Sequence, residues 1–342
     1  MINSISIEEF LKLAERLPVL DARTPKEYEA GHIPVAQSFP IFSDDERAKV
    51  GTAYKHQGHD PAVLMGLDLF GPKMSGFVKE ASKLAPEKDV LLHCWRGGMR
   101  SGAMAWLLSF SGFKVHLLQG GYKAYRQHLH QQFEKQQKLL ILSGFTGSGK
   151  TDLLPYLQEQ NQQVIDLEKL ASHKGSAFGS IGMAPQPTTE HFENMLGTEL
   201  LKLDNSTPLW LEDESISIGR AQLPKPFFDQ MQQAPTIVLQ VPQQLRVQKL
   251  TEEYCRTDKS ILTAGILKIK KRLGGLATKE ALTAIENDDM EKMVSIALSY
   301  YDKAYTFDLA QKQHVLQLEL ESINPEENAT KVLAFAKQYQ LI

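Results

Sequence analysis

The feature that most constrains this chain is the stretch GFTGSGKT at residues 144–151, which fits G-x-x-x-x-G-K-[ST] in full. An apolar run at residues 139–143 precedes it, and a helix-compatible stretch follows, which is the context that the motif requires. Backbone N–H groups of such a loop surround a phosphate, and a lysine adds positive charge. The predicted phosphate-binding residues are Gly144, Gly147, Ser148, Gly149, Lys150 and Thr151. The motif specifies a di- or triphosphate, and both a nucleotide and a non-nucleotide diphosphate satisfy it.

Length and composition predict a globular protein of more than one domain. At roughly 100–200 residues per domain, 342 residues predict about two domains. Hydrophobic residues make up 42% and charged residues 23%, a balance that excludes collagen-like and wholly disordered chains. Two cysteines, Cys94 and Cys255, are too few for a disulfide framework or a Cys-rich zinc module. With no targeting signal and no membrane-spanning run visible, we expect a cytoplasmic protein.

Short apolar runs alternate with helical patterns, which predicts parallel α/β sheets. In the first part of the chain, strands are expected at residues 17–21, 89–93 and 114–118. Residues 128–138 are polar and Gln-rich, and we interpret them as a linker helix between domains at 1–127 and 139–342. The second domain is expected to add strands at 139–143, 164–167, 208–211, 236–241 and 314–320, and a mainly helical, basic portion around 243–306.

Cys94 directly follows a predicted buried strand and begins a loop, CWRGGMR, that leads into a helix. Loop amides and a helix N-terminus favour an anion at this position, and Arg96 and Arg100 add positive charge. Gly97 and Gly98 allow the loop amides to converge. An isolated cysteine is more often a buried core residue, but this neighbourhood favours a nucleophilic thiol.

These residues, together with the segments LDARTP at 20–25 and GHIP at 31–34, resemble a rhodanese domain over residues 17–126. The resemblance implies that Cys94 carries sulfur or selenium as an adduct. We expect Asp21, Arg23 and His32 to support the fold of this domain. Cys255 has an adjacent arginine but no glycine loop, and we interpret it as structural.

An acidic triplet follows the predicted strand at 208–211. In LWLEDE, Asp213 or Glu212 can hold Mg²⁺ directly or through water, and a solvated acidic turn is an equally good interpretation. Whether this site holds a metal therefore stays open at the level of the sequence.

Positive charge gathers in residues 243–279, although the whole chain has a formal net charge of −3. Such a segment can follow an RNA backbone, and the alternative is a set of solvated helix faces. The candidate RNA-binding residues are Arg246, Lys249, Lys268, Lys270, Lys271 and Arg272.

A rhodanese-like domain followed by a phosphate-loop domain resembles the tRNA 2-selenouridine synthase family over nearly the whole chain. Further segments carry this resemblance: DER at 45–47, VGTAYK at 50–55, GGYK at 120–123, HKGSAFG at 173–179, EDES at 212–215 and RLGG at 272–275.

The resemblance implies a transferase that acts on a wobble 5-substituted 2-thiouridine of tRNA. Geranyl diphosphate first alkylates the sulfur, and selenium from selenophosphate then replaces the S-geranyl group, with an S-selanylcysteine intermediate at Cys94. Selenophosphate and geranyl diphosphate are thus expected as co-substrates, with Mg²⁺ possible and no tightly bound cofactor. The expected partners are tRNA and a selenophosphate-supplying enzyme, with no membrane.

Two alternatives belong to other classes. One is a rhodanese-type sulfurtransferase fused to an ATP-dependent kinase-like domain without an RNA substrate. The other is a regulatory nucleotide-binding protein with an inert rhodanese module, against which the intact Cys94 and its two arginines argue.

Overall fold

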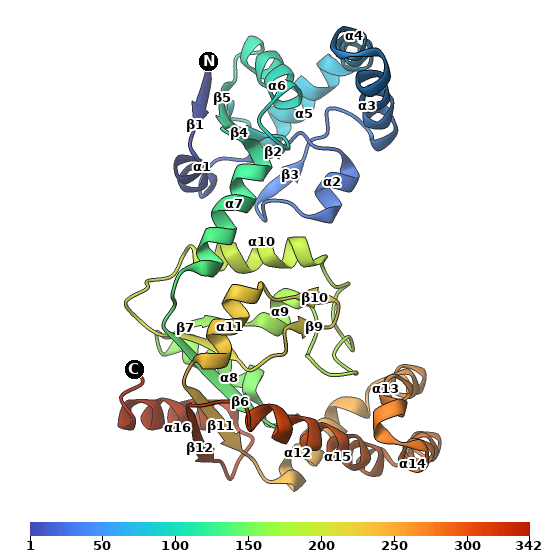
Figure 1. Ribbon diagram of the computed structural model, residues 1–342, viewed down its shortest axis with the longest axis vertical. Coiled ribbons are helices and arrows are strands. Elements are labelled where there is room, and N and C mark those ends of the chain that lie inside the picture. The colour runs from blue at the N-terminus through green and yellow to red at the C-terminus, as the bar shows by residue number, and fades with distance from the viewer. The chain divides into compact units, whose positions relative to one another are not determined.

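The computed structural model describes residues 1–307 and 309–342 and contains two compact units, Met1–Gln132 and Phe133–Ile342 (Figure 1). Each unit has its own five-stranded parallel sheet with helices around it, so the predicted α/β fold class is confirmed. Within this described part of the chain, no helix is both long enough and apolar enough to cross a membrane.

The first unit has the strand order β1-β5-β4-β2-β3. These strands are β1 (Ile2–Ile5), β2 (Val19–Asp21), β3 (Ala36–Ser38), β4 (Asp89–His93) and β5 (Lys114–Leu118). Strand β4 lies in the middle of the sheet, and its residues Val90, Leu91 and Leu92 have no exposed surface. Such a strand needs an apolar sequence on both faces, which is why the run at 89–93 is recognisable from the sequence.

Helices surround this sheet, and one of them begins at the end of the central strand. The elements are α1 (Ile7–Ala14), α2 (Pro25–Ala30), α3 (Asp44–Gln57), α4 (His59–Phe70), η1 (Gly71–Lys73), α5 (Met74–Leu84), α6 (Met99–Phe110) and α7 (Gly121–Glu134). The region 43–75 has weak periodicity in the sequence, yet it is helical. Ser43 begins it with a capping box to Glu46, a local signal that the periodicity does not contain.

The second unit has the strand order β12-β11-β6-β8-β7, again all parallel. Its strands are β6 (Leu139–Gly144), β7 (Gln163–Ile165), β8 (Leu209–Glu212), β11 (Thr236–Gln240) and β12 (Val315–Glu319), and β9 (Ser217–Ile218) and β10 (Ala221–Gln222) form a separate antiparallel pair. Because β6 pairs directly with β8, the phosphate loop and the acidic triplet follow neighbouring strands.

The expected linker helix at 128–138 differs from the structure. Helix α7 begins earlier, at Gly121, and ends at Glu134, and β6 begins at Leu139. The polar composition of 128–138 therefore covers the end of a helix and the approach to a strand. The helices that follow in this unit are α8 (Lys150–Glu159), α9 (Leu167–Ala171), α10 (Thr189–Leu200), α11 (Lys225–Gln233) and α16 (Pro325–Gln338).

A helical group is inserted between β11 and β12, as the sequence predicts for the region around 243–306 (Figure 1). It consists of α12 (Gln243–Tyr254), α13 (Lys259–Leu273), α14 (Gly275–Glu286) and α15 (Met290–Leu309). These helices share a hydrophobic core that also takes in Phe178, from the loop after α9. The helical group is thereby attached to the sheet that carries the phosphate loop.

Candidate active sites

The Cys94 loop joins β4 to α6, and backbone contacts hold it in place. Tyr122 N donates to Cys94 O at 2.8 Å, and Lys123 N donates to Trp95 O at 2.9 Å. Gly121 has φ +60, and a Cβ there would lie 2.4 Å from Cys94 O. Glycine is required at this position because backbone approaches backbone with no room for a side chain.

The Cys94 side chain is free of disulfide bonding and 3% exposed. Its Sγ lies 3.1 Å from Ser101 Oγ, within hydrogen-bond distance, and the serine hydroxyl also donates to Gly98 O at 3.2 Å. Ser101 is not among the site residues predicted from the sequence. Its position in the first turn of the helix after the loop is a signal that could have identified it. The site can hold an anionic sulfur or selenium atom against a hydroxyl and a helix N-terminus.

The two loop arginines have different environments. Arg96 is exposed, whereas the guanidinium of Arg100 makes a bidentate pair with the carboxylate of Glu27 from α2. Burial alone would raise the pKa of Glu27, but the bonds from Arg100 and the Thr24 amide outweigh burial and lower it. The Glu27 pair ties the Cys94 loop to α2, so Arg100 helps to position the loop. Its predicted effect on the Cys94 thiol stays a prediction.

Beneath the loop, Arg23 is fully buried and donates to both oxygens of Asp21 and to Gly31 O. Its guanidinium lies 3.7 Å from the ring centroid of Tyr122. His93 is also fully buried, and burial lowers its pKa. These internal contacts agree with the structural role expected for Asp21 and Arg23.

The phosphate loop joins β6 to α8, and its glycines adopt the conformations that the motif needs. Gly147 and Gly149 both have φ +83. The ammonium of Lys150 donates to Gly144 O at 2.7 Å, and Thr151 Oγ1 donates to Glu168 Oε2 at 2.8 Å. Ser148 is 2% exposed, and its hydroxyl oxygen has no hydrogen-bond partner in the described part of the chain.

The first two acids of the triplet, Glu212 and Asp213, already have protein partners. Glu212 is fully buried and accepts a bond from Glu168 N at 2.8 Å. Burial, followed by the nearby Asp166 carboxylate, raises the pKa of Glu212 well above its ordinary value. Asp213 pairs with Lys312 at 2.6 Å. Over residues 1–307 and 309–342, no three His, Cys, Asp or Glu side chains converge as a metal site. In this structure Glu212 and Asp213 are therefore engaged with protein groups, and a role for either in holding Mg²⁺, directly or through water, stays a prediction.

A cavity of about 980 Å³ opens in front of the phosphate loop. Residues 146, 147 and 149–152 of the loop and of α8 line it. The helical group supplies a second wall, formed by Lys249, Leu250, Tyr254, Ile269, Arg272, Tyr300, Tyr301 and Tyr305. The helical wall is therefore mixed, since the charged side chains of Lys249, Glu253 and Arg272 lie among aromatic and aliphatic ones.

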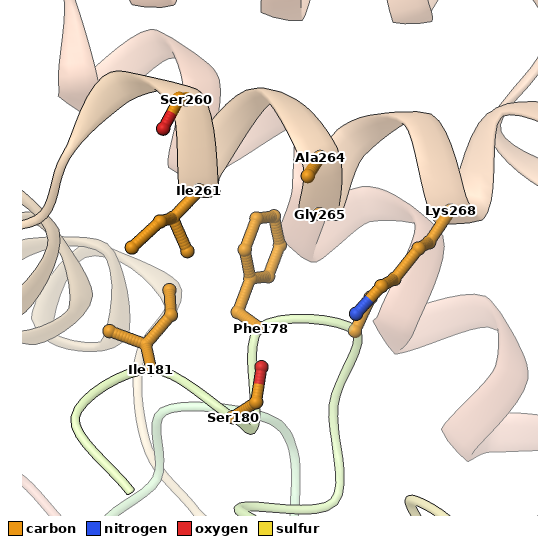
Figure 2. Close-up of a pocket in the computed structure, with 9 residues that line it drawn as sticks. Phe178, Ser180, Ile181, Ser260, Ile261, Ala264, Gly265 and Lys268 are labelled. Atoms are coloured by element: carbon orange, nitrogen blue, oxygen red, sulfur yellow. The ribbon is translucent and has the colours of Figure 1, made fainter.

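A smaller cavity of about 320 Å³ lies behind this wall, between the loop after α9 and helix α13 (Figure 2). The Phe178 ring points toward Gly265, whose absent side chain makes room for it, since a Cβ there would lie 2.3 Å from the ring. Ile181, Ile261 and Lys268 also line the cavity. Phe178 lines both cavities and packs in the core of the helical group, so it joins that group to the loop.

The candidate tRNA-binding residues separate into two sets. Lys268, Lys270, Lys271 and Arg272 are exposed on α13. Arg246 is 4% exposed, and its guanidinium pairs with Asp302, so burial contradicts its predicted place on an RNA-binding surface. Lys249 pairs with Asp152 at the phosphate loop. Helix α12 therefore faces the loop, because its basic residues lie on its packed side.

Cys255, interpreted as structural, is exposed.

Two family models match this chain. The model for the AAA domain of tRNA 2-selenouridine synthase matches residues 137–339, and a rhodanese-like domain model matches residues 6–128.

Among similar proteins, the tRNA 2-selenouridine synthase of Shewanella frigidimarina is 37% identical over 337 residues, or 88% of this chain and 91% of the relative. That of Shewanella denitrificans is 36% identical over 350 residues, or 90% and 93%. A solved N-terminal domain from Clostridium difficile 630, of a protein described as binding ATP or GTP, is 42% identical over 36% of this chain and 97% of that one, with a TM-score of 0.35.

Proposed function

The chain belongs to the tRNA 2-selenouridine synthase family, and from this premise we propose that it makes 2-selenouridine at the wobble position of tRNA in two steps. The observation that carries the proposal is the presence of two separately built anion sites, the Cys94 loop and the phosphate loop, in one chain. The first suits selenium chemistry, and the second suits a diphosphate leaving group.

In the first step, geranyl diphosphate binds with its diphosphate on the amides of loop 144–151. The C2 sulfur of 2-thiouridine attacks C1 of the geranyl group, and the C1–O bond breaks. Pyrophosphate leaves with the electron pair, while the N3 proton of the base passes to solvent. Negative charge grows on the leaving group, and Lys150 and the loop amides lower the barrier by offsetting that charge.

The shape of the cleft supports an isoprenoid donor. Its helical wall contains Leu250, which packs against Gly147 of the loop, and the buried Tyr254 and Ile269. Tyr300 and Tyr301, which are partly buried, also line it. The Tyr301 hydroxyl already accepts a bond from Ala177 N at 2.9 Å. A ten-carbon apolar chain gains from burial on such a wall without needing hydrogen bonds.

In the second step, water attacks the phosphorus of selenophosphate, the P–Se bond breaks, and phosphate leaves with selenium released as hydrogen selenide ion. This ion adds at C2, its proton ends on N3, and the geranyl thiolate leaves with the C2–S electron pair and takes up a proton from solvent. Carbon keeps its oxidation level, and alkylation has turned a poor leaving group into a good one. The Cys94 loop lies in a different unit from the phosphate loop, which supports a separate role in handling selenium from selenophosphate. The S-selanyl adduct on Cys94 stays a prediction, as do the cytoplasmic location and a selenophosphate-supplying partner.

The exposed basic residues of α13 support binding of the tRNA through its phosphates. Lys268, Lys270 and Lys271 lie near one end of the helix, with Arg272 directly after them. Phosphate contacts supply affinity and position without reading sequence.

The proposal is tested by mass spectrometry of wobble nucleosides from cells with and without this gene, followed by reconstitution. Purified protein with thiouridine-containing tRNA and geranyl diphosphate, but no ATP, should form S-geranyl-2-thiouridine. Adding selenophosphate should then form 2-selenouridine. An obligatory need for ATP in the first step would instead favour the kinase-like interpretation of the phosphate loop.

A further inference from the structure

Lys249 belongs to helix α12, yet its ammonium lies directly at the phosphate loop. A Cβ on Gly149 would be 3.1 Å from Lys249 Nζ. The same ammonium pairs with Asp152, whose Oδ2 would lie 3.6 Å from that Cβ. Gly149 is the N-cap of α8 and is followed by Lys150. Two lysines from distant parts of the chain therefore lie at the anion-binding end of one helix.

The rest of α12 fixes where Lys249 can reach. Buried Arg246 donates to Thr146 O in the loop at 3.2 Å and pairs with Asp302 of α15 at 2.8 Å. On the next turn, Leu250 Cδ1 would lie 3.0 Å from a Cβ on Gly147. These contacts hold the backbone of α12 against the loop, so the Lys249 side chain needs only a rotamer change to reach a bound anion.

We propose that Lys249 is the second cation of the diphosphate site and that Asp152 holds it until a diphosphate binds. The ligand class is any molecule that presents two linked phosphates to the loop. The identity of its organic group rests on the proposed function, but the role of Lys249 does not.

The Lys249–Asp152 ion pair can break easily, so that Lys249 exchanges Asp152 for a bound diphosphate. Its side chains are 25% and 53% exposed, whereas those of the Lys312–Asp213 pair in the same cleft are 4% and 12% exposed. Exposed ion pairs contribute little stability, because water screens them. Asp152 lies in the first turn of α8, so it keeps a favourable interaction with the helix N-terminus after Lys249 leaves. A diphosphate on the loop offers the ammonium more negative charge than one carboxylate does.

This proposal moves Lys249 out of the predicted tRNA-binding set. The two roles differ in what the side chain contacts, and binding measurements with two probes separate them. Inorganic pyrophosphate reports on the phosphate loop, and tRNA reports on the exposed basic surface.

The test uses the full-length protein and calorimetric titration with inorganic pyrophosphate. Lys249→Ala should weaken pyrophosphate binding about tenfold to a hundredfold, as expected for removal of a charge-assisted hydrogen bond. Asp152→Asn should tighten it by roughly threefold to tenfold, because Lys249 is then released and a repelling charge is removed. If Asp152 acts by holding Lys249, most of that gain should disappear in the double variant.

The controls use an ion pair of the same kind outside the cleft. Lys225 and Asp229 pair on α11 at 2.8 Å, with side chains 75% and 48% exposed. Lys225→Ala and Asp229→Asn carry the same changes of charge, and both should leave pyrophosphate affinity within about twofold. Thermal unfolding of all five variants should match that of the wild type.

Three results would overturn the proposal. Unchanged pyrophosphate affinity in Lys249→Ala, with weakened tRNA binding, would return this residue to the tRNA surface. Equal tightening by Asp152→Asn with and without Lys249 would show that Asp152 acts only through its own charge. If pyrophosphate and ATP both fail to bind the wild type, this proposal falls together with the proposed function. If ATP binds but geranyl diphosphate does not, only the proposed function fails, and the same variants are compared with ATP.

Discussion

The Cys94 loop and the phosphate loop begin from the same local structure and end as different kinds of site. Each follows a buried central strand of a parallel sheet, passes through glycines and enters a helix. Around Cys94 the close contacts join backbone to backbone, as between Gly121 and Cys94 O. Around the phosphate loop they involve side chains of another helix, as between Gly147 and Leu250. The first site is thus preformed, and the second can adjust to its ligand.

The cationic side chains of the two sites also differ in how firmly they are held. Arg100 is held by both oxygens of Glu27, with side chains 15% and 27% exposed. The Lys150 ammonium donates to a main-chain oxygen and lies 5.4 Å from the ring centroid of Tyr305, and Lys249 pairs with an exposed carboxylate. A site for one atom of sulfur or selenium needs fixed geometry. A site whose ligand departs as a charged diphosphate benefits from cations that can move with it.

The largest expected effect tests whether the two sites have separate roles. Cys94→Ala should abolish formation of 2-selenouridine and leave alkylation close to the wild-type rate, because the thiol lies in the unit without the phosphate loop. Mass spectrometry should find S-geranyl-2-thiouridine accumulating in the variant. Cys255→Ala is the matched control, since it removes an exposed thiol outside the loop. Normal selenouridine in Cys94→Ala would contradict the assignment.

The reciprocal variant is Lys150→Ala. Removal of one charge-stabilising donor typically costs about 10²–10³ in rate, so alkylation should slow by that factor. Conversion of pre-geranylated tRNA to 2-selenouridine should be unchanged. Single-turnover rates of both steps provide the measurement, and a wild-type alkylation rate in this variant would remove the phosphate loop from the first step.

A third prediction concerns the exposed basic residues of α13 and the binding of tRNA. Reversing Lys270, Lys271 and Arg272 to Glu should weaken tRNA binding. The slope of the logarithm of the binding constant against the logarithm of the salt concentration should become shallower, by roughly 0.7–0.9 for each tRNA phosphate that the protein no longer neutralises. Filter binding across a range of salt concentrations measures this slope. The control reverses three lysines outside this helix to Glu, Lys225, Lys331 and Lys337. It changes the net charge by the same amount and should leave the slope nearly unchanged. Equal slopes in both triple variants would mean that α13 binds no phosphate.

Two glycine substitutions compare the rigidity of the loops. Gly121→Ala should reduce stability by about 3 kcal/mol, because its Cβ meets the Cys94 carbonyl at 2.4 Å and the backbone cannot give way. The Cβ of Gly147→Ala meets side-chain atoms only, Leu250 Cδ1 at 3.0 Å and Arg246 Cβ at 3.3 Å, rather than backbone. Its cost should be about 1–2 kcal/mol, mainly from its positive φ. Denaturant unfolding measures both variants. Equal decreases in stability would show that the Cys94 loop is no more rigid than the phosphate loop.

The smallest expected effect comes from Glu212 beneath the phosphate loop. Its pKa is raised by burial, so its contribution to stability is full below the ordinary value of 4.5 and is lost as pH rises through the folded pKa. Glu212→Gln does not titrate and should be the more stable protein at pH 8, by about 2–4 °C in Tm, or roughly 1 kcal/mol. The difference should shrink toward pH 4. A difference that does not depend on pH would mean that the carboxyl is not neutral in the folded protein.

Several elements could be predicted from the sequence because their signals are local. The strands at 89–93 and 114–118 agree with β4 and β5 at both ends, since central strands of a parallel sheet are apolar throughout. Strand β1 and helix α1 were missed, because β1 is an edge strand with only Ile5 buried. The helices within 43–75 were missed because α3 is largely polar and buries only Ala53.

The sequence by itself determined the two glycine loops, their position after buried strands, and the family to which the chain belongs. These depend on residues adjacent in the chain, where spacing and residue type restrict the backbone directly. Only the tertiary structure decided which charges meet. Glu27 and Arg100 are 73 residues apart, and Lys249 and Asp152 are 97 apart. Such pairs are made by the packing of separate helices and strands, which leaves no periodic signal in the sequence. The basic segment therefore divides among buried Arg246, Lys249 beside the phosphate loop, and the exposed residues of α13.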